Sequence, residues 1–84
     1  MDTKKINEER DNDPFIVQVD LEIEGLEPIK VVGCNSLENA IELYKDFQTQ
    51  FKNVENARWI ALSKLGKLGY EQQKLYDLKD EEEI

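Results

Sequence analysis

The chain contains no histidine and a single cysteine, Cys34. One cysteine cannot close a disulfide within the chain, and structural zinc sites need four Cys or His ligands at short paired spacings. Histidine is also the residue that most often transfers protons in enzymes. The composition therefore excludes an internal disulfide and a zinc site of the usual kind. It leaves carboxylates, lysines, tyrosines and Cys34 as the candidates for catalysis.

None of these candidates forms a recognisable catalytic set. Cys34 lies beside the expected start of a helix, where the dipole favours the thiolate, but a free cysteine more commonly packs as a small buried side chain. Asp20, Glu22 and Glu24 alternate before a glycine, as ligands do in a calcium-binding loop. The twelfth position of that loop, however, is Val31 instead of the required bidentate Glu. We expect no enzymatic activity, no metal and no other cofactor.

Long apolar runs and phosphate-binding loops are also missing. No segment approaches the roughly 20 consecutive apolar residues that a membrane-spanning helix needs, and the N-terminal residues lack the apolar stretch of a signal peptide. Gly66 and Gly69 are followed by neither a lysine-serine pair nor a βαβ unit, so nucleotide binding is not expected. These features predict a cytoplasmic protein.

Acidic charge is what the chain has in excess. Nineteen Asp and Glu residues oppose eleven Lys and Arg residues, which gives a net charge of −8 over 84 residues. This charge repels nucleic-acid phosphates and anionic membranes and favours a basic partner, although it would also serve simply to keep a small protein in solution. A domain of this length without a disulfide or a metal is marginally stable, so we also expect a homodimer.

The charge is distributed unevenly along the chain. Residues 1–13 are polar and predict a flexible arm, whereas residues 77–84 carry a block of like charge that predicts a flexible acidic tail. Between them, residues 14–76 hold nine acidic and seven basic residues, a net charge of only −2. We expect this central segment to be a single α+β domain.

The start of this domain has the period of two that is typical of a half-buried strand. The apolar positions are Phe15, Val17, Val19, Leu21 and Ile23, and the positions between them are Ile16, Gln18, Asp20, Glu22 and Glu24. Residues 25–28 supply turn chemistry and residues 29–32 form a second β-branched run. The two runs predict a hairpin with a four-residue connection.

A helix and a second hairpin complete the predicted domain. Asn35 and Glu38 have the spacing of a capping box, and an apolar stripe follows at Leu37, Ala40, Ile41, Tyr44, Phe47 and Phe51. Residues 57–78 fit either a second helix or a hairpin. Gly66 and Gly69 favour the hairpin, because each would cost a helix interior about 1 kcal/mol. The predicted order is ββαββ, a four-stranded antiparallel sheet with one helix on one face and the other face open.

The acidic residues of this fold are the first candidate binding site. Strand alternation places Asp20, Glu22 and Glu24 on one face, about 6.6 Å apart, with Glu27 following in the turn. The alternative is an ordinary solvated strand face. Together with the acids of the tail, the candidate partner-binding residues are Asp20, Glu22, Glu24, Glu27, Asp80, Glu81, Glu82 and Glu83.

The second hairpin carries the opposite charge. Trp59 and Tyr70 lie among basic residues, with a local charge of +3 from Arg58, Lys64, Lys67 and Lys74 against Glu71. Such a surface would hold single-stranded nucleic acid weakly or meet the acidic hairpin of a second copy. Trp59 would equally suit the core.

Taken together, the short ββαββ chain, the acids between residues 20 and 27 and the DEEE run at residues 80–83 resemble the small acidic bacteriophage proteins of the DNA-mimic type. The resemblance implies a host-takeover protein, a non-enzymatic inhibitor or regulator acting in the host cytoplasm. It would present carboxylates to the basic nucleic-acid-binding surface of a host protein, such as a histone-like nucleoid protein. The alternatives are an assembly module that forms homo-oligomers and the weak nucleic-acid binder described above.

Overall fold

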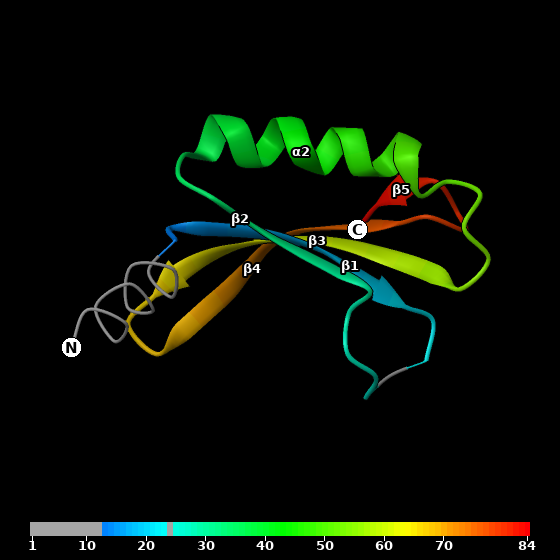
Figure 1. The fold of residues 1–84 in the computed structure, drawn as a ribbon, viewed down its shortest axis with the longest axis horizontal. Helices are drawn as coiled ribbons and strands as arrows, with labels where there is room; N and C mark the ends of the chain where they lie inside the picture. Colours follow the sequence, from blue (N-terminus) through cyan, green and yellow to red (C-terminus); the bar gives the residue numbers. More distant parts are fainter. Residues whose placement is uncertain (1–12, 24) are drawn as a thin grey trace, which may run out of the picture.

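The computed structural model of the chain describes residues 13–23 and 25–84. Glu24 lies outside the described residues. The arm predicted for residues 1–13 also lies outside them, except for its last residue, Asp13. The elements in chain order are β1 (Phe15–Leu21), β2 (Lys30–Cys34), α2 (Leu37–Gln50), β3 (Ala57–Gly66), β4 (Gly69–Asp77) and β5 (Glu82–Glu83). Figure 1 shows α2 lying across one face of the sheet, while the connection between β1 and β2 extends away from the other face. In the described part of the chain, no helix is long and apolar enough to cross a membrane.

The strands form one antiparallel sheet in the order β2-β1-β3-β4-β5. The predicted α+β class is confirmed for the described residues, but the predicted count of four strands is wrong. The segment expected to be an acidic tail contributes the fifth strand, in which Glu82–Glu83 pairs with the end of β4. Like charge does not prevent this pairing because Glu83 lies 3.8 Å from the Lys74 ammonium and accepts a hydrogen bond of 3.0 Å from the Tyr44 hydroxyl.

Strand β1 confirms the predicted alternation only as far as its end at Leu21. Val17 and Val19 are fully buried, as the pattern requires. At the end of the strand Asp20 pairs with Trp59 but Leu21 pairs with Ala57, so Arg58 is an extra residue and forms a β-bulge. Strand β1 itself ends at Leu21, so its alternation does not continue to Glu22, and the connection to β2 spans residues 22–29 instead of 25–28.

Helix α2 carries the predicted apolar stripe but begins with a different cap. Ala40, Tyr44 and Phe47 are buried, and the edges of the stripe are partly exposed. Asn35 was expected to cap the helix, but the N-cap is Ser36, whose Oγ accepts a 3.1 Å hydrogen bond from the backbone N–H of Asn39. Asn35 instead accepts a hydrogen bond of 3.1 Å from the Asn39 side chain. The shift reflects competition between two neighbouring residues that are both good caps.

The second half of the sheet is the predicted hairpin and not a second helix. Strands β3 and β4 pair from Gly66 opposite Gly69 to Trp59 opposite Asp77, with residues 67–68 as the turn. Gly69 has a φ of +130°, a conformation that residues with side chains rarely adopt, so this glycine permits the tight return.

The core lies between α2 and the strands beneath it. Its buried side chains are Val17, Val19, Cys34, Ala40, Tyr44, Phe47, Ala57, Ile60, Leu62 and Leu78. Burial, and then the nearby charge of Asp13, raise the pKa of the Cys34 thiol. Cys34 is therefore held in its neutral form as a packing residue.

Candidate functional site: the open face of the sheet

The face of the sheet opposite α2 carries its own rows of side chains. Strand pairing aligns Val31, Gln18, Ala61 and Leu75 in one row across β2, β1, β3 and β4. The next row aligns Asp20 with Trp59. Since neighbouring residues of a strand point to opposite faces, these rows lie away from the core residues Val17, Val19, Ile60 and Leu62.

This open face contains a concavity of about 460 Å³. The strands and the connection between β1 and β2 together line it with Gln18, Asp20, Leu21, Ile23, Gly25, Leu26, Pro28, Trp59, Gln72 and Leu75. Among the described lining residues, most side chains are apolar and Asp20 is the charged one. We call this hollow the Asp20 concavity.

The carboxylate of Asp20 is oriented but not neutralised. Both of its oxygens accept hydrogen bonds from Nε2 of Gln18, at 2.9 and 3.2 Å. Its side chain is partly buried, and no lysine or arginine of the described residues forms an ion pair with it. A partly desolvated carboxylate with a neutral partner favours the approach of a cation.

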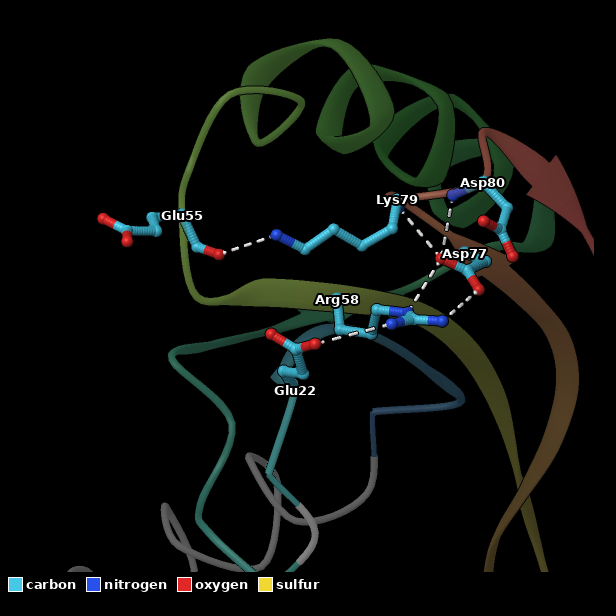
Figure 2. Close-up of polar contacts among 6 residues, drawn as sticks. All are labelled: Glu22, Glu55, Arg58, Asp77, Lys79 and Asp80. Carbon is cyan, nitrogen blue, oxygen red and sulfur yellow. Dashed lines mark hydrogen bonds and ion pairs between the residues drawn. The ribbon is translucent and has the colours of Figure 1, made fainter.

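Arg58, the bulge residue, lies beside this concavity and is already paired. Its Nη2 donates to Oδ2 of Asp77 at 3.0 Å, its Nε lies 2.9 Å from Oδ1, and Glu22 approaches Nη1 at 3.6 Å. Figure 2 shows the guanidinium between the two carboxylates. The guanidinium carbon also lies 4.9 Å from the centre of the Trp59 ring. Arg58 thus makes a cation–π contact with the indole on the open face.

Asp77 anchors the end of β4 through several donors. In addition to Arg58, its Oδ1 accepts backbone hydrogen bonds from Lys79 at 2.9 Å and from Asp80 at 3.2 Å, and the Lys79 ammonium donates to the carbonyl of Glu55 at 3.0 Å (Figure 2). Burial of the Asp77 carboxyl opposes its ionisation. The hydrogen bonds from Arg58, Asp80 and Lys79 outweigh burial, so the pKa of Asp77 is lowered.

The C-terminal acids proposed as binding residues lie apart from this face. Glu81 pairs with Lys52 at 3.4 Å. Glu83, together with Tyr44 and Lys74, lines a second concavity of about 670 Å³ between α2 and β4. Asp80 and Glu82 are exposed. Two of the four predicted tail carboxylates are therefore engaged with cations of the same chain.

The structure also separates the predicted row of acids on the first strand. Asp20 lies in the concavity, Glu22 turns toward Arg58, Glu27 is exposed on the connection, and Glu24 lies outside the described residues. The end of β1 at Leu21 explains the difference, because Glu22 and Glu27 lie in the connection to β2 and outside the regular alternation of the strand.

The aromatic and basic residues of the second hairpin do not form one surface. Trp59 lies on the open face, whereas Lys64 and Lys74 lie on the helix side, where they line a groove with Leu37 and Ile41. The hydroxyl of Tyr70 donates to the backbone carbonyl of Asp13 at 2.7 Å. The alternation of β3 was visible in the sequence and would have separated Trp59 from Lys64.

Among residues 13–23 and 25–84, no cluster of three or more His, Cys, Asp or Glu side chains is arranged to hold a metal ion. Comparisons of the chain with family models, with curated protein sequences and with solved structures find no match.

Proposed function

We propose that the protein is a non-enzymatic binding protein whose open sheet face occupies a basic surface of another protein. The observation that carries this proposal is the Asp20 carboxylate, which is oriented by Gln18 but lacks a cation in the described part of the chain. Glu22 and Glu27 add negative charge nearby, and the positive charge of Arg58 is balanced by Asp77. The negative charge of this face would therefore attract a positively charged partner.

Exposed apolar side chains make a protein the favoured partner. Ile23, Leu26, Ile29 and Val31 are 67, 54, 42 and 51% exposed and belong to β2 or to the connection before it. Apolar contacts flanked by charges that set the orientation are typical of protein interfaces. Nucleic acid fits poorly, because its phosphates would meet Asp20, Glu22 and Glu27.

The same proposal includes the biological consequence of such binding. A basic surface that the partner uses to hold nucleic acid would be blocked by carboxylates, so the protein would act as an inhibitor or regulator by DNA mimicry. We place this interaction in the cytoplasm, where a single free cysteine such as Cys34 remains reduced.

A pair of charge-matched variants tests the proposal. The open-face variant is Asp20→Asn, Glu22→Gln and Glu27→Gln, and the control is Glu42→Gln, Asp46→Asn and Glu55→Gln, which removes exposed acids elsewhere. The parent and the control should retain a DNA-binding protein from a bacterial lysate and compete with DNA for it, whereas the open-face variant should not. Retention should fall steeply between roughly 50 and 200 mM salt.

Equal retention by both variants, or equal loss, would contradict the proposal. Equal retention would show that the open-face acids are not used, and equal loss would show that net charge matters but its position does not. Circular dichroism and melting of all three proteins should be the same, because the replaced side chains are exposed or partly exposed.

Self-association is a second candidate, favoured by one observation. Strand β2 pairs with β1 on one side and lies at the edge of the sheet, with Val31 51% exposed. Such an edge is able to pair with the same strand of a second copy. In that case dilution should lower the melting temperature and Val31→Lys should give a monomer. A concentration-independent melting temperature together with a monomer in sedimentation would remove this candidate.

A further inference from the structure

We infer that the Asp20 concavity is a receptor for one arginine side chain of the partner protein. The inference rests on the proposed function for the existence of that partner, and it goes further by naming the group that is recognised. Three properties of the concavity support it: the geometry of the carboxylate, the nature of the walls and the charge around the rim.

The carboxylate retains acceptor capacity for a charge-assisted hydrogen bond from a cation. Nε2 of Gln18 donates to both oxygens of Asp20 and so lies on the side between them, which leaves the outer acceptor position of each oxygen. A guanidinium directs an N–H group to one of these outer positions while its planar face stacks on an aromatic ring, here Trp59. A lysine ammonium is a point charge and does not use this geometry.

The walls suit the rest of an arginine side chain. Leu21, Leu26, Pro28 and Leu75 line the concavity together with Trp59. Arginine buries its methylene stem along apolar surface while its charged end stays at a polar group, which here is Asp20. The volume of about 460 Å³ lies within the range of specific ligand pockets, roughly 300–1,000 Å³, and admits one such side chain.

The surrounding charge does not oppose a cation. Arg58 lies over the Trp59 ring and would repel a second guanidinium if its own charge were free. It contacts Asp77, which balances that charge, and Glu22, which adds a further negative charge. Glu27, exposed on the connection, adds attraction at the rim.

Trp59 provides a direct readout, because it is the single tryptophan of the chain. The test titrates the full-length protein at low salt with the peptide Ac-Ala-Arg-Ala-NH₂ and follows the indole N–H signal of Trp59 and the side-chain amide of Gln18 by NMR. The same peptide with lysine is the other cation, and the peptide with citrulline is the neutral isostere of arginine.

The arginine peptide should give saturable shifts at both groups, with an affinity at least several-fold higher than that of the lysine peptide, and the citrulline peptide should give none. Asp20→Asn should abolish the shifts, and Asp46→Asn, on the exposed side of α2, should preserve them. Leu26→Ala, at a residue that is 54% exposed, should weaken binding several-fold without affecting the fold. This variant keeps the test decisive if Asp20→Asn alters folding.

Equal affinity for arginine and lysine, saturable binding of citrulline, or shifts unchanged by both Asp20→Asn and Leu26→Ala would each overturn the inference. Failure of the proposed function would look different, because the peptide titration requires no partner. If the peptide bound but no basic protein competed with DNA for the open face, the receptor would stand and the proposed function would fail. If the peptide did not bind but the open-face variant still lost its partner, the reverse would hold.

Discussion

The two faces of the sheet treat their acidic side chains differently. On the helix side, Glu83 lies near Lys74 and accepts a hydrogen bond from Tyr44, while Glu81 pairs with Lys52. On the open face, Asp20 is held by an amide and has no ion-pair partner among the described residues. This difference shows that a net charge of −8 does not by itself identify which surface would bind a partner. The informative charge is the one that the fold orients and leaves without a counterion.

The largest expected effect compares apolar packing on the two faces. Leu62 is fully buried beneath α2, so Leu62→Ala should lower the free energy of unfolding by about 2–5 kcal/mol. Leu75 is partly buried on the open face, so Leu75→Ala should cost clearly less. Urea denaturation of both variants measures the difference. Equal losses would mean that the open face is covered in solution and would break the comparison.

A second effect concerns pH and arises at the junction of the two faces. The pKa of Asp77 is lowered in the folded protein, so ionisation of this carboxyl stabilises the folded state relative to the unfolded state. This contribution is present above the unfolded-state pKa and is lost as the pH falls through the lowered folded-state pKa. Melting temperature measured across the acid range should therefore fall in that window.

Asp77→Asn provides the control for this pH effect. The amide keeps the size of the side chain but does not titrate, so the variant should be less stable near neutral pH and should show a shallower acid decline than the parent. An unchanged acid decline would show that other carboxylates, and not the contacts of Asp77 with Arg58 and the backbone, govern acid stability.

A third, smaller effect tests how the helix side is organised. Ser36→Ala removes the acceptor for the Asn39 N–H and should lower stability by about 1 kcal/mol. Asn35→Ala is the matched variant and should cost less, because Asn35 accepts its hydrogen bond from the Asn39 side chain and not from a backbone N–H of the first turn. Thermal melting of the two variants decides which residue caps α2, and a larger loss for Asn35→Ala would restore the cap expected from the sequence.

The smallest effect sharpens the difference between paired and unpaired acids. Tyr44→Phe removes the hydrogen bond to Glu83 and should cost about 0.5 kcal/mol, the lower end of the range for such bonds, because Glu83 is half exposed. Burial and then the Glu83 hydrogen bond raise the pKa of the Tyr44 phenol. Absorbance titration should therefore show Tyr44 ionising above the ordinary tyrosine range. Partner binding should not change in this variant, and a loss of binding would place the interface on the helix side.

The parts of the fold that depend on local periodicity were predictable from the sequence. The alternation from Phe15 to Leu21, the apolar stripe of α2 and the turn around Gly66 each involve neighbouring residues. The β-bulge at Arg58 depends on how β3 pairs with β1, which is distant in sequence, so no local sequence pattern indicated it. Strand β5 was not predicted, because its run of like charges indicated a flexible tail. The partners of Glu83, which are Lys74 and Tyr44, lie elsewhere in the chain.

The candidate site was predictable only in part. The alternation of the first strand indicated Asp20 as a candidate. Its separation from Glu22 follows from the contact of Glu22 with Arg58. Its apolar surroundings come from β1 with its connection, β3 and β4, which are distant in sequence and meet only in the fold. The identity of a partner and the DNA-mimic hypothesis remain predictions, as does the dimer.

The pairing of β1 with β3 has a consequence for the kinetics of folding. The turns of the two hairpins join strands that are close in sequence, whereas Phe15 and Lys64, which are opposite each other across β1 and β3, are separated by β2 and α2. Contacts between distant residues form slowly because a long loop must close first. We therefore expect the β3–β4 hairpin to form early and the docking of β1 on β3 to limit the rate. Refolding should accordingly slow more for Val17→Ala than for a substitution at the exposed turn residue Leu68.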